Sequence, residues 1–306
     1  MEKIFKNVSL LSATLVLILL IGIFSVLFNN SKLAIDEFGF NFIVDTTWNQ
    51  DVPVLNTLSK TAQNPAGVQM LDEYGDPLTK TIYGGLIPIV GTILSTLIAM
   101  VFALPIAMGI AVFLAEIAPK NISSIVGIAI ELLAAIPSII FGMWGLFYFA
   151  PIVQSFVGGY QVSLLTAGLV LGIMILPFMA AITRDSMNTT PDVLKESAYA
   201  LGATKFEVIK DIIFPYSKTG IIGSIILALG RALGETMAVA FLIGSVFDLP
   251  RAINSPTVSI PVALANNFGE ASGLAESSLF YLALLLFIIS FAVISIAKFY
   301  FLRKAN

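Results

Sequence analysis

Long apolar segments dominate this chain and set its architecture. A membrane-spanning helix needs about 20 mostly apolar residues, and six segments reach that length. They cover residues 8–28, 86–115, 122–149, 162–183, 219–247 and 279–302. The hydrophobic pattern therefore predicts an all-α membrane protein with six transmembrane helices.

Prolines and glycines inside these segments predict local features of the bundle. Pro105, Pro137 and Pro177 fall within the second, third and fourth spans and predict kinks there. Gly168 and Gly172, four residues apart in the fourth span, predict close packing against another helix. The first apolar segment exceeds the core of a typical signal peptide and lacks a clear cleavage site. We expect it to be retained as an anchor.

Composition supports a membrane location and argues against an enzyme. Hydrophobic residues make up 58% of the chain and charged residues 11%, whereas soluble domains carry about 25% charged residues. The chain has no cysteine and no histidine. This excludes disulfides and thiolate chemistry, and it removes the usual general base near neutral pH. We cannot assemble a nucleophile with its base from the remaining groups.

The distribution of basic residues predicts the orientation. With a cytoplasmic amino terminus, eleven Lys and Arg residues lie in inner segments and four in outer ones, as the positive-inside rule requires. We therefore expect three parts: a tail and anchor helix (1–28), an extracytoplasmic loop (29–84) and a transmembrane core (85–306) with an inner polar loop (184–218). Both termini are then cytoplasmic. The inner basic residues are Lys3, Lys6, Lys120, Arg184, Lys195, Lys205, Lys210, Lys218, Lys298, Arg303 and Lys304, and the outer ones are Lys32, Lys60, Lys80 and Arg251.

The outer loop is the part of the chain that can hold structure outside the membrane. Aromatic residues alternate from Phe38 to Phe42 and Trp48 follows, a pattern that predicts a short strand. The loop is also acidic, with seven Asp and Glu residues. Two interpretations stay open: a surface for an extracytoplasmic partner, or a connector packed on the bundle.

The polar segment between the fourth and fifth spans predicts a compact knob of two short helices. Thr190 is placed to cap the first helix, and Gly202 can take the left-handed conformation that ends it. Thr204 and Glu207 have the spacing of a capping box for the second helix, and Pro215 is expected to break the pattern before the next span.

Three charged residues lie deep within the predicted spans, away from their ends: Glu131, Arg231 and Glu235. A charge at mid-bilayer costs about 2.5 to 3.5 kcal/mol on insertion scales, so each needs a partner or a wet cavity. Glu235 follows Arg231 by one helical turn, and we expect the two to pair on one face. This predicts the wall of a polar path, with an ion pair that only fixes packing as the alternative. Glu131 either lines the same path or satisfies backbone groups freed at Pro137.

The spacing of residues in the knob resembles the coupling motif of permease subunits of binding-protein-dependent ABC importers. Ser197 stands where that motif usually has alanine, and Phe214 stands where it usually has leucine; both keep the size class. The resemblance implies docking on a separate ATPase, whereas an ordinary amphipathic loop is the simpler alternative. The matching positions are Glu196, Ser197, Ala198, Gly202, Ile212 and Pro215.

Further segments, taken in order, resemble the PstC-type permeases of bacterial phosphate ABC importers. They lie at 83–92, 114–119, 131–137, 142–145, 174–177 and 230–239. The resemblance implies a type I ABC importer permease fold with a MetI-like core in the bacterial cytoplasmic (inner) membrane. It also implies a PstA-type second permease, a PstB-type ATPase dimer and a PstS-type phosphate-binding protein, with membrane lipid around the bundle and no nucleic acid.

The energy source is expected on another chain. A nucleotide-binding P-loop needs Gly-Lys followed by Ser or Thr, and Gly-Lys occurs nowhere in this sequence. We therefore expect no cofactor on this chain, with ATP bound by the partner. Two other functions stay open: a permease for another oxyanion such as sulfate or molybdate, and an ion-coupled secondary transporter, which would work without an ATPase.

Overall fold

The structure is a computed structural model that describes residues 2–56, 68–69, 71 and 78–303. Two of the basic residues used above to predict the orientation, Lys60 and Lys304, lie outside these ranges. Within them, six helical segments are long and apolar enough to cross a membrane, which confirms the predicted number. They are Ile4–Phe38, Leu86–Ile117, Ser138–Val157, Leu164–Asn188, Lys205–Leu233 and Leu274–Phe299.

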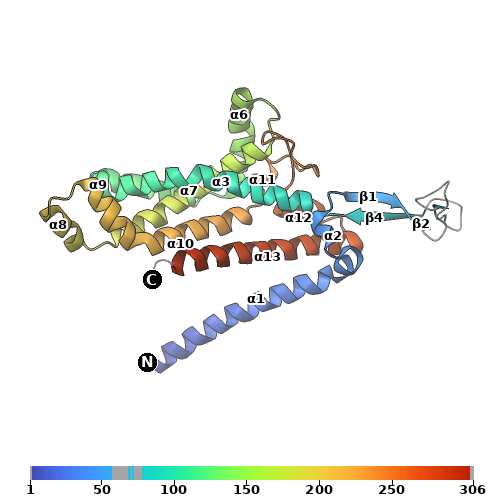
Figure 1. The fold of residues 1–306 in the computed structure, drawn as a ribbon, viewed down its shortest axis with the longest axis horizontal. Coiled ribbons are helices and arrows are strands. Elements are labelled where there is room, and N and C mark those ends of the chain that lie inside the picture. Colours follow the sequence, from blue (N-terminus) through green and yellow to red (C-terminus); the bar gives the residue numbers. More distant parts are fainter. Residues whose placement is uncertain (1, 57–67, 70, 72–77, 304–306) are drawn as a thin grey trace.

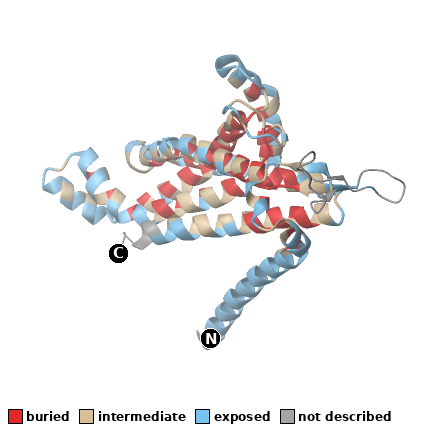
Figure 2. Cartoon of the chain, turned by 45° about the vertical axis from the view of Figure 1, so that its right-hand side comes forward, coloured by how far each residue is buried: buried red, intermediate tan, exposed pale blue. Residues whose placement is uncertain are grey.

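Four long helices run side by side and form the centre of the bundle (Figure 1). They are α3 (Leu86–Val112, continued by the π-helical η2, Phe113–Ile117), α7 (Leu164–Asn188), α10 (Phe214–Leu233) and α13 (Leu274–Arg303). In the most apolar stretch of α7, 61% of the residues are buried inside the chain. The corresponding share is 28% in each of the candidate spans that contain α3, α10 and α13. Neighbouring helices therefore surround α7, and the core of the fold lies along it (Figure 2).

The two glycines of α7 bring it close to α3, as predicted. A Cβ on Gly168 would lie 2.6 Å from Ile98 Cγ2, and one on Gly172 would lie 2.9 Å from Phe102 Cδ1. Distances this short are essentially never found for real Cβ atoms, so glycine at both positions lets the two helices approach closely. Pro105 and Pro177 lie inside continuous helices.

The first helix, α1 (Glu2–Phe38), is longer than predicted. The helix continues past the expected boundary at residue 28, because no glycine or proline occurs between that residue and Gly39, which adopts a φ of +53°. Inner and outer refer from here on to the predicted sides of the membrane. Near its predicted outer end, α1 is tied to α13: the Ala34 N–H donates to Ser277 Oγ (3.0 Å), and this hydroxyl donates to the Asn30 carbonyl (2.8 Å). The inner half of α1 is exposed (Figure 2).

The third predicted span is wrong. A break at residues 135–137 divides it, because Pro137 disfavours helical geometry at the preceding residue. The candidate span after the break is Ser138–Val157, and its last part projects from the side of the bundle (Figure 1). The pieces are α4 (Lys120–Ala134), α5 (Ser138–Trp144), η3 (Gly145–Phe149, π-helical) and α6 (Ala150–Val157).

The fifth predicted span is also wrong at both ends. It begins with α9 (Lys205–Glu207) and η4 (Val208–Ile213, π-helical), which run into α10 without a break. It ends at Leu233 rather than at residue 247, well short of the outer end of the bundle (Figure 1). Gly234 ends the helix, and the short helices α11 (Met237–Ala240) and α12 (Ile260–Asn267) follow.

The outer end carries two short β-ladders. Strands β1 (Trp48–Pro53) and β4 (Thr79–Tyr83) pair antiparallel, with Asp51 opposite Thr81. Strands β2 (Leu55–Asn56) and β3 (Val68–Gln69) form the second antiparallel pair.

The strand predicted at Phe38–Phe42 is wrong, because α2 (Asn41–Val44) is helical. A helical turn places Phe42 in the core, where its ring stacks on Tyr281 with the ring centroids 4.5 Å apart. The strand starts at Trp48 instead. The Trp48 ring stacks on Phe247, with the ring centroids 4.7 Å apart, and joins the hairpin to the outer segment after α11.

The two ends of the bundle differ in kind. Both chain ends and the short helices α8 (Asp192–Ala200) and α9 lie toward one end, and the β1–β4 hairpin lies at the opposite end (Figure 1). The predicted knob and the predicted outer loop are therefore on opposite sides of the membrane-spanning part.

Candidate functional site

The predicted knob is present at the inner end of the bundle. It consists of α8, a turn and α9. Gly202 forms the turn with a φ of +89°, a conformation that favours glycine. Thr204 Oγ1 accepts from the Glu207 N–H (3.4 Å), and Glu207 Oε2 accepts from the Thr204 N–H (2.7 Å). The left-handed glycine and the capping box are both confirmed.

The knob exposes large apolar side chains. Leu201 is 90% exposed, Phe206 71% and Val193 70%. The chain itself does not cover these three side chains, and α8 contains no buried residue. A cluster of this kind on a solvent-facing turn is typical of a protein interaction site.

A short ion pair fixes the knob to the bundle. Lys195 Nζ lies 2.6 Å from Glu116 Oε1, with side chains 16% and 10% exposed. Glu116 belongs to η2, so this pair connects α8 to the inner end of α3. A small apolar core beside it supports the same junction, with Ala198 and Ala203 packed against Ala111, Met187, Val208, Ile213 and Ile221.

The residues that resemble the coupling motif lie along this knob and the helix after it. Glu196, Ser197, Gly202 and Pro215 are exposed, and Ala198 and Ile212 are half-buried. Ser197 Oγ donates to the Val193 carbonyl (2.7 Å). The hydroxyl is satisfied within its own helix, which explains why serine fits where the motif usually has alanine.

Two details predicted for this segment are wrong. Thr190 does not cap α8: the capping position belongs to Pro191, and Thr190 Oγ1 is buried without a hydrogen-bond partner. Pro215 does not break the following helix. It lies in the first turn of α10, directly after the wide π-helical turn of η4, which makes room for its ring.

Arg231 lies in the last turn of α10, where the helix stops inside the bundle. Its side chain is half-buried, and its guanidinium carbon lies 5.7 Å from the centre of the Phe178 ring of α7. Among the described residues, no carboxylate oxygen comes within 4.0 Å of its nitrogens. A buried Thr183–Ser224 hydroxyl contact (2.7 Å) holds α7 and α10 together nearby.

The predicted Arg231–Glu235 pair is wrong. Because α10 ends at Leu233, Glu235 does not follow on the same helical face. Its Oε1 accepts instead from the Ala238 N–H (3.2 Å) and so stabilises the start of α11.

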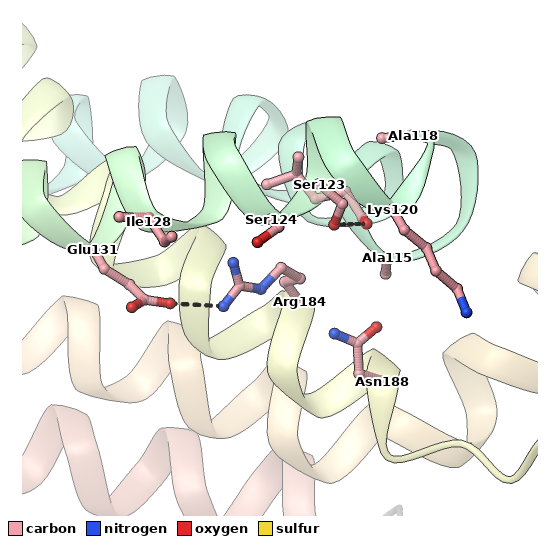
Figure 3. Close-up of a pocket in the computed structure, with 10 residues that line it drawn as sticks. Ala115, Ala118, Lys120, Ser123, Ser124, Ile128, Glu131, Arg184 and Asn188 are labelled. Atoms are coloured by element: carbon pink, nitrogen blue, oxygen red, sulfur yellow. Dashed lines mark hydrogen bonds and ion pairs between the residues drawn. The ribbon is translucent and has the colours of Figure 1, made fainter.

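Glu131 is in α4, outside all six candidate spans, so its predicted position within a span is wrong. Its Oε1 accepts from Arg184 Nη2 (2.9 Å) rather than from backbone groups at the Pro137 break. Arg184 also donates from Nε (3.0 Å) and Nη2 (2.8 Å) to Asp185 Oδ1. This cluster borders a pocket of about 470 Å³ between α4 and the inner part of α7 (Figure 3).

Sequence reasoning missed the ion pairs of Arg184 and Lys195. Both residues counted only as inner positive charges, and the partners that join them to other helices, Glu131 and Glu116, lie 53 and 79 residues away. Their local contacts, with Asp185 and Asp192, give no sign of these long-range pairs. One signal could have pointed to Arg184: Gly127 in α4, where a Cβ would lie 2.1 Å from Arg184 Nη1.

The sequence matches a transport family over most of its length. Residues 103–305 match the family described as "Binding-protein-dependent transport system inner membrane component". The phosphate transport system permease protein PstC of Pasteurella multocida is 42% identical over 322 residues, covering 99% of this chain and 92% of that protein. The protein of the same name in Haemophilus influenzae is 43% identical over 317 residues, covering 97% and 92%.

Solved structures support the fold. The MetNI methionine ABC transporter in an inward-facing conformation aligns with a TM-score of 0.52 and 18% identity, covering 71% of this chain and 92% of that chain. A bacterial ABC transporter involved in the import of the polysaccharide alginate aligns with a TM-score of 0.57 and 14% identity, covering 72% and 80%. The predicted MetI-like fold is confirmed. The chain is a multi-pass membrane protein that belongs to the PstC-type permeases, within the family of binding-protein-dependent transport system inner membrane components.

Proposed function

We propose that this chain is the permease subunit of an ATP-driven importer and carries inorganic phosphate across the membrane by alternating access. The observation that carries the proposal is the guanidinium of Arg231, half-buried inside the bundle with no carboxylate partner among the described residues. Such a group needs a wet cavity or a counter-ion. The names of the near full-length relatives support phosphate as that counter-ion.

Two helix breaks in the bundle support a polar path. One separates α4 from α5 at Pro137, and the other separates α10 from α11 at Gly234. The pieces after the breaks touch closely, since a Cβ on Gly142 of α5 would lie 3.0 Å from Ala238 Cα of α11. Broken helices at membrane depth are tolerated where they line a cavity, and they are typical of substrate sites in transporters.

Arg231 and Glu235 have complementary roles in this proposal. A guanidinium offers fixed donors that suit a tetrahedral oxyanion. An ionised carboxylate can only accept a hydrogen bond, so Glu235 favours protonated phosphate over fully deprotonated sulfate. Glu131 borders the path from its position on α4, where it accepts a hydrogen bond from Arg184.

The knob couples transport to a separate ATPase. Its exposed residues Leu201, Phe206 and Val193 offer an apolar surface for the cleft of an ATPase subunit. Closure of an ATPase pair would move the knobs of two permease subunits and change which side of the bundle is open. We infer a PstA-type second permease and a PstB-type ATPase dimer as partners.

An outer phosphate-binding protein of the PstS type is the remaining partner. A pocket of about 590 Å³ lies at the outer end, between the start of β1 and the segment that contains Asp248 and Arg251. The Trp48–Phe247 stack joins the walls of this pocket, so a protein docked on the hairpin can act on the segment that follows α11.

We infer that the knob and both termini are cytoplasmic. The chain has no cysteine, so single cysteines can be labelled cleanly. A cysteine at the exposed Asp51 should react with an impermeant maleimide added to intact cells, whereas one at the exposed Lys205 should react only after the membrane is opened. The reverse labelling pattern would overturn the orientation.

Uptake by the complete importer tests the function. The chain is reconstituted with its second permease, ATPase and binding protein, and uptake of radiolabelled phosphate is measured with excess sulfate or molybdate as competitor. We expect uptake that requires ATP and is not suppressed by sulfate or molybdate. Uptake without the ATPase would instead show a secondary transporter, and suppression by sulfate or molybdate would show another oxyanion permease.

A further inference from the structure

Beside the pocket, the Arg184 cation is largely buried and its carboxylate partners are exposed. The Arg184 side chain is only 13% exposed, whereas its two carboxylate partners, Glu131 and Asp185, are 58% and 64% exposed. The guanidinium is fixed in place because Gly127 leaves room for Nη1 against α4. The cation is therefore enclosed, whereas both carboxylates reach the surface.

Free hydrogen-bond donors surround the same pocket. The two carboxylates occupy Nε and Nη2 of Arg184, and among the described residues Nη1 has no acceptor. Ser124, Asn188 and Lys120 also line the pocket, and no described residue bonds to their side chains (Figure 3). A volume of about 470 Å³ leaves ample room for a tetrahedral anion with water.

The pocket lies on the inner side of Arg231. Phe178, which contacts Arg231, precedes Arg184 by six residues on α7, or about 9 Å along the helix axis. Asp185 follows Phe178 by seven residues and so shares its face of α7. Along the axis of α7, the Arg184 pocket therefore lies between Arg231 and the knob.

We propose that Arg184, Ser124 and Asn188 form a second oxyanion site at the inner end of the path, and that Glu131 competes with the anion for the guanidinium. The proposal rests on the proposed function and assigns inorganic phosphate as the ligand. Lys120 and Arg184 balance Glu131 and Asp185 in formal charge, so the site binds an anion weakly. Weak binding suits an exit site, from which the ligand must leave.

Inhibition by phosphate from the inner side tests the site. The complete importer is reconstituted in proteoliposomes, and initial ATP-driven uptake is measured at increasing lumenal inorganic phosphate. The wild type should be inhibited at high lumenal phosphate. Arg184→Lys keeps the positive charge but loses the fixed N–H donors of the guanidinium. Ser124→Ala and Asn188→Ala each lose one hydrogen-bond donor. Each should raise the half-inhibitory concentration about tenfold, as expected for one hydrogen bond to a charged group.

Glu131→Gln and a matched control complete the test. Glu131→Gln removes the competing charge and should lower the half-inhibitory concentration. Lys298→Gln removes an exposed inner charge on α13, outside the pocket, and should change nothing. Because Ser124→Ala and Asn188→Ala keep every ion pair, they decide the question if Arg184→Lys does not assemble.

The outcomes separate the two proposals. A wild type that imports no phosphate overturns the proposed function. A wild type that imports phosphate without inhibition from the lumen overturns the exit site alone. Unchanged inhibition in Ser124→Ala and Asn188→Ala, or an equal shift in Lys298→Gln, also overturns the exit site.

Discussion

The Lys195–Glu116 pair is expected to transmit force from the ATPase to the bundle. Lys195 lies next to Glu196 of the coupling motif, and Glu116 ends the long helix that begins as α3. The pair is thus a direct polar link between the docking surface and a membrane-spanning helix. Glu116→Gln or Lys195→Met removes one charge and breaks this link.

The size of the effect follows from the geometry of the pair. The contact is short, 2.6 Å, and both side chains are at least 84% shielded, because their exposures are 16% and 10%. Hydrogen bonds to charged groups contribute about 1.5 to 3 kcal/mol, which corresponds to a factor of about 10 to 150 in an equilibrium. By contrast, Lys210 and Asp211 lie 3.9 Å apart and are 63% and 60% exposed. Exposed pairs of this kind contribute about 0 to 1 kcal/mol.

The assay is the number of phosphate ions imported per ATP hydrolysed in proteoliposomes. Each single variant should lower this ratio about tenfold or more while ATP hydrolysis continues. The charge swap Glu116→Lys with Lys195→Glu should recover a substantial part of it. Lys210→Met, in the same knob, should stay near the wild type. Normal coupling in the single variants, or a swap no better than either one, would refute the transmitting role.

Three further variants test the named positions. Gly202→Asp should leave the chain in the membrane but uncouple it, because a side chain at a φ of +89° strains the docking turn; normal uptake would contradict the assignment. Arg231→Gln should reduce phosphate uptake at least about tenfold with normal co-purification of the partners, whereas loss of assembly would favour a purely structural role. Glu235→Gln should lower the preference for phosphate over sulfate in a competition assay, and an unchanged preference would discard its proposed role.

The sequence predicted those features that depend on local chemistry. The capping box needs only Thr204 and Glu207 three residues apart, and the left-handed turn needs only Gly202. Both are properties of a few neighbouring residues and formed as predicted. The close packing at Gly168 and Gly172 was also predictable, because small residues at this spacing have few other uses in a membrane helix.

The sequence could not predict where apolar helices stop. Hydropathy joins α4 to α5 and α10 to the residues after Gly234, because long apolar segments flank both breaks. Each break depends instead on backbone effects: Pro137 restricts the residue before it, and the Glu235 carboxylate starts a new short helix. The pairing of Arg231 with Glu235 failed for this reason, since it assumed a continuous helix.

The packing of α7 explains how movement of the knob can reach the path. The Lys195–Glu116 pair ties the knob to η2, and η2 continues α3. Close contact at Gly168 and Gly172 leaves α3 no freedom to slide independently of α7. Because α7 carries both Phe178 and Arg184, a tilt of α3 driven from the knob changes the surroundings of both guanidiniums in the same step. Transport and ATP hydrolysis are then linked by rigid contacts along one route, which makes the ion pair at its inner end the most sensitive place to interrupt it.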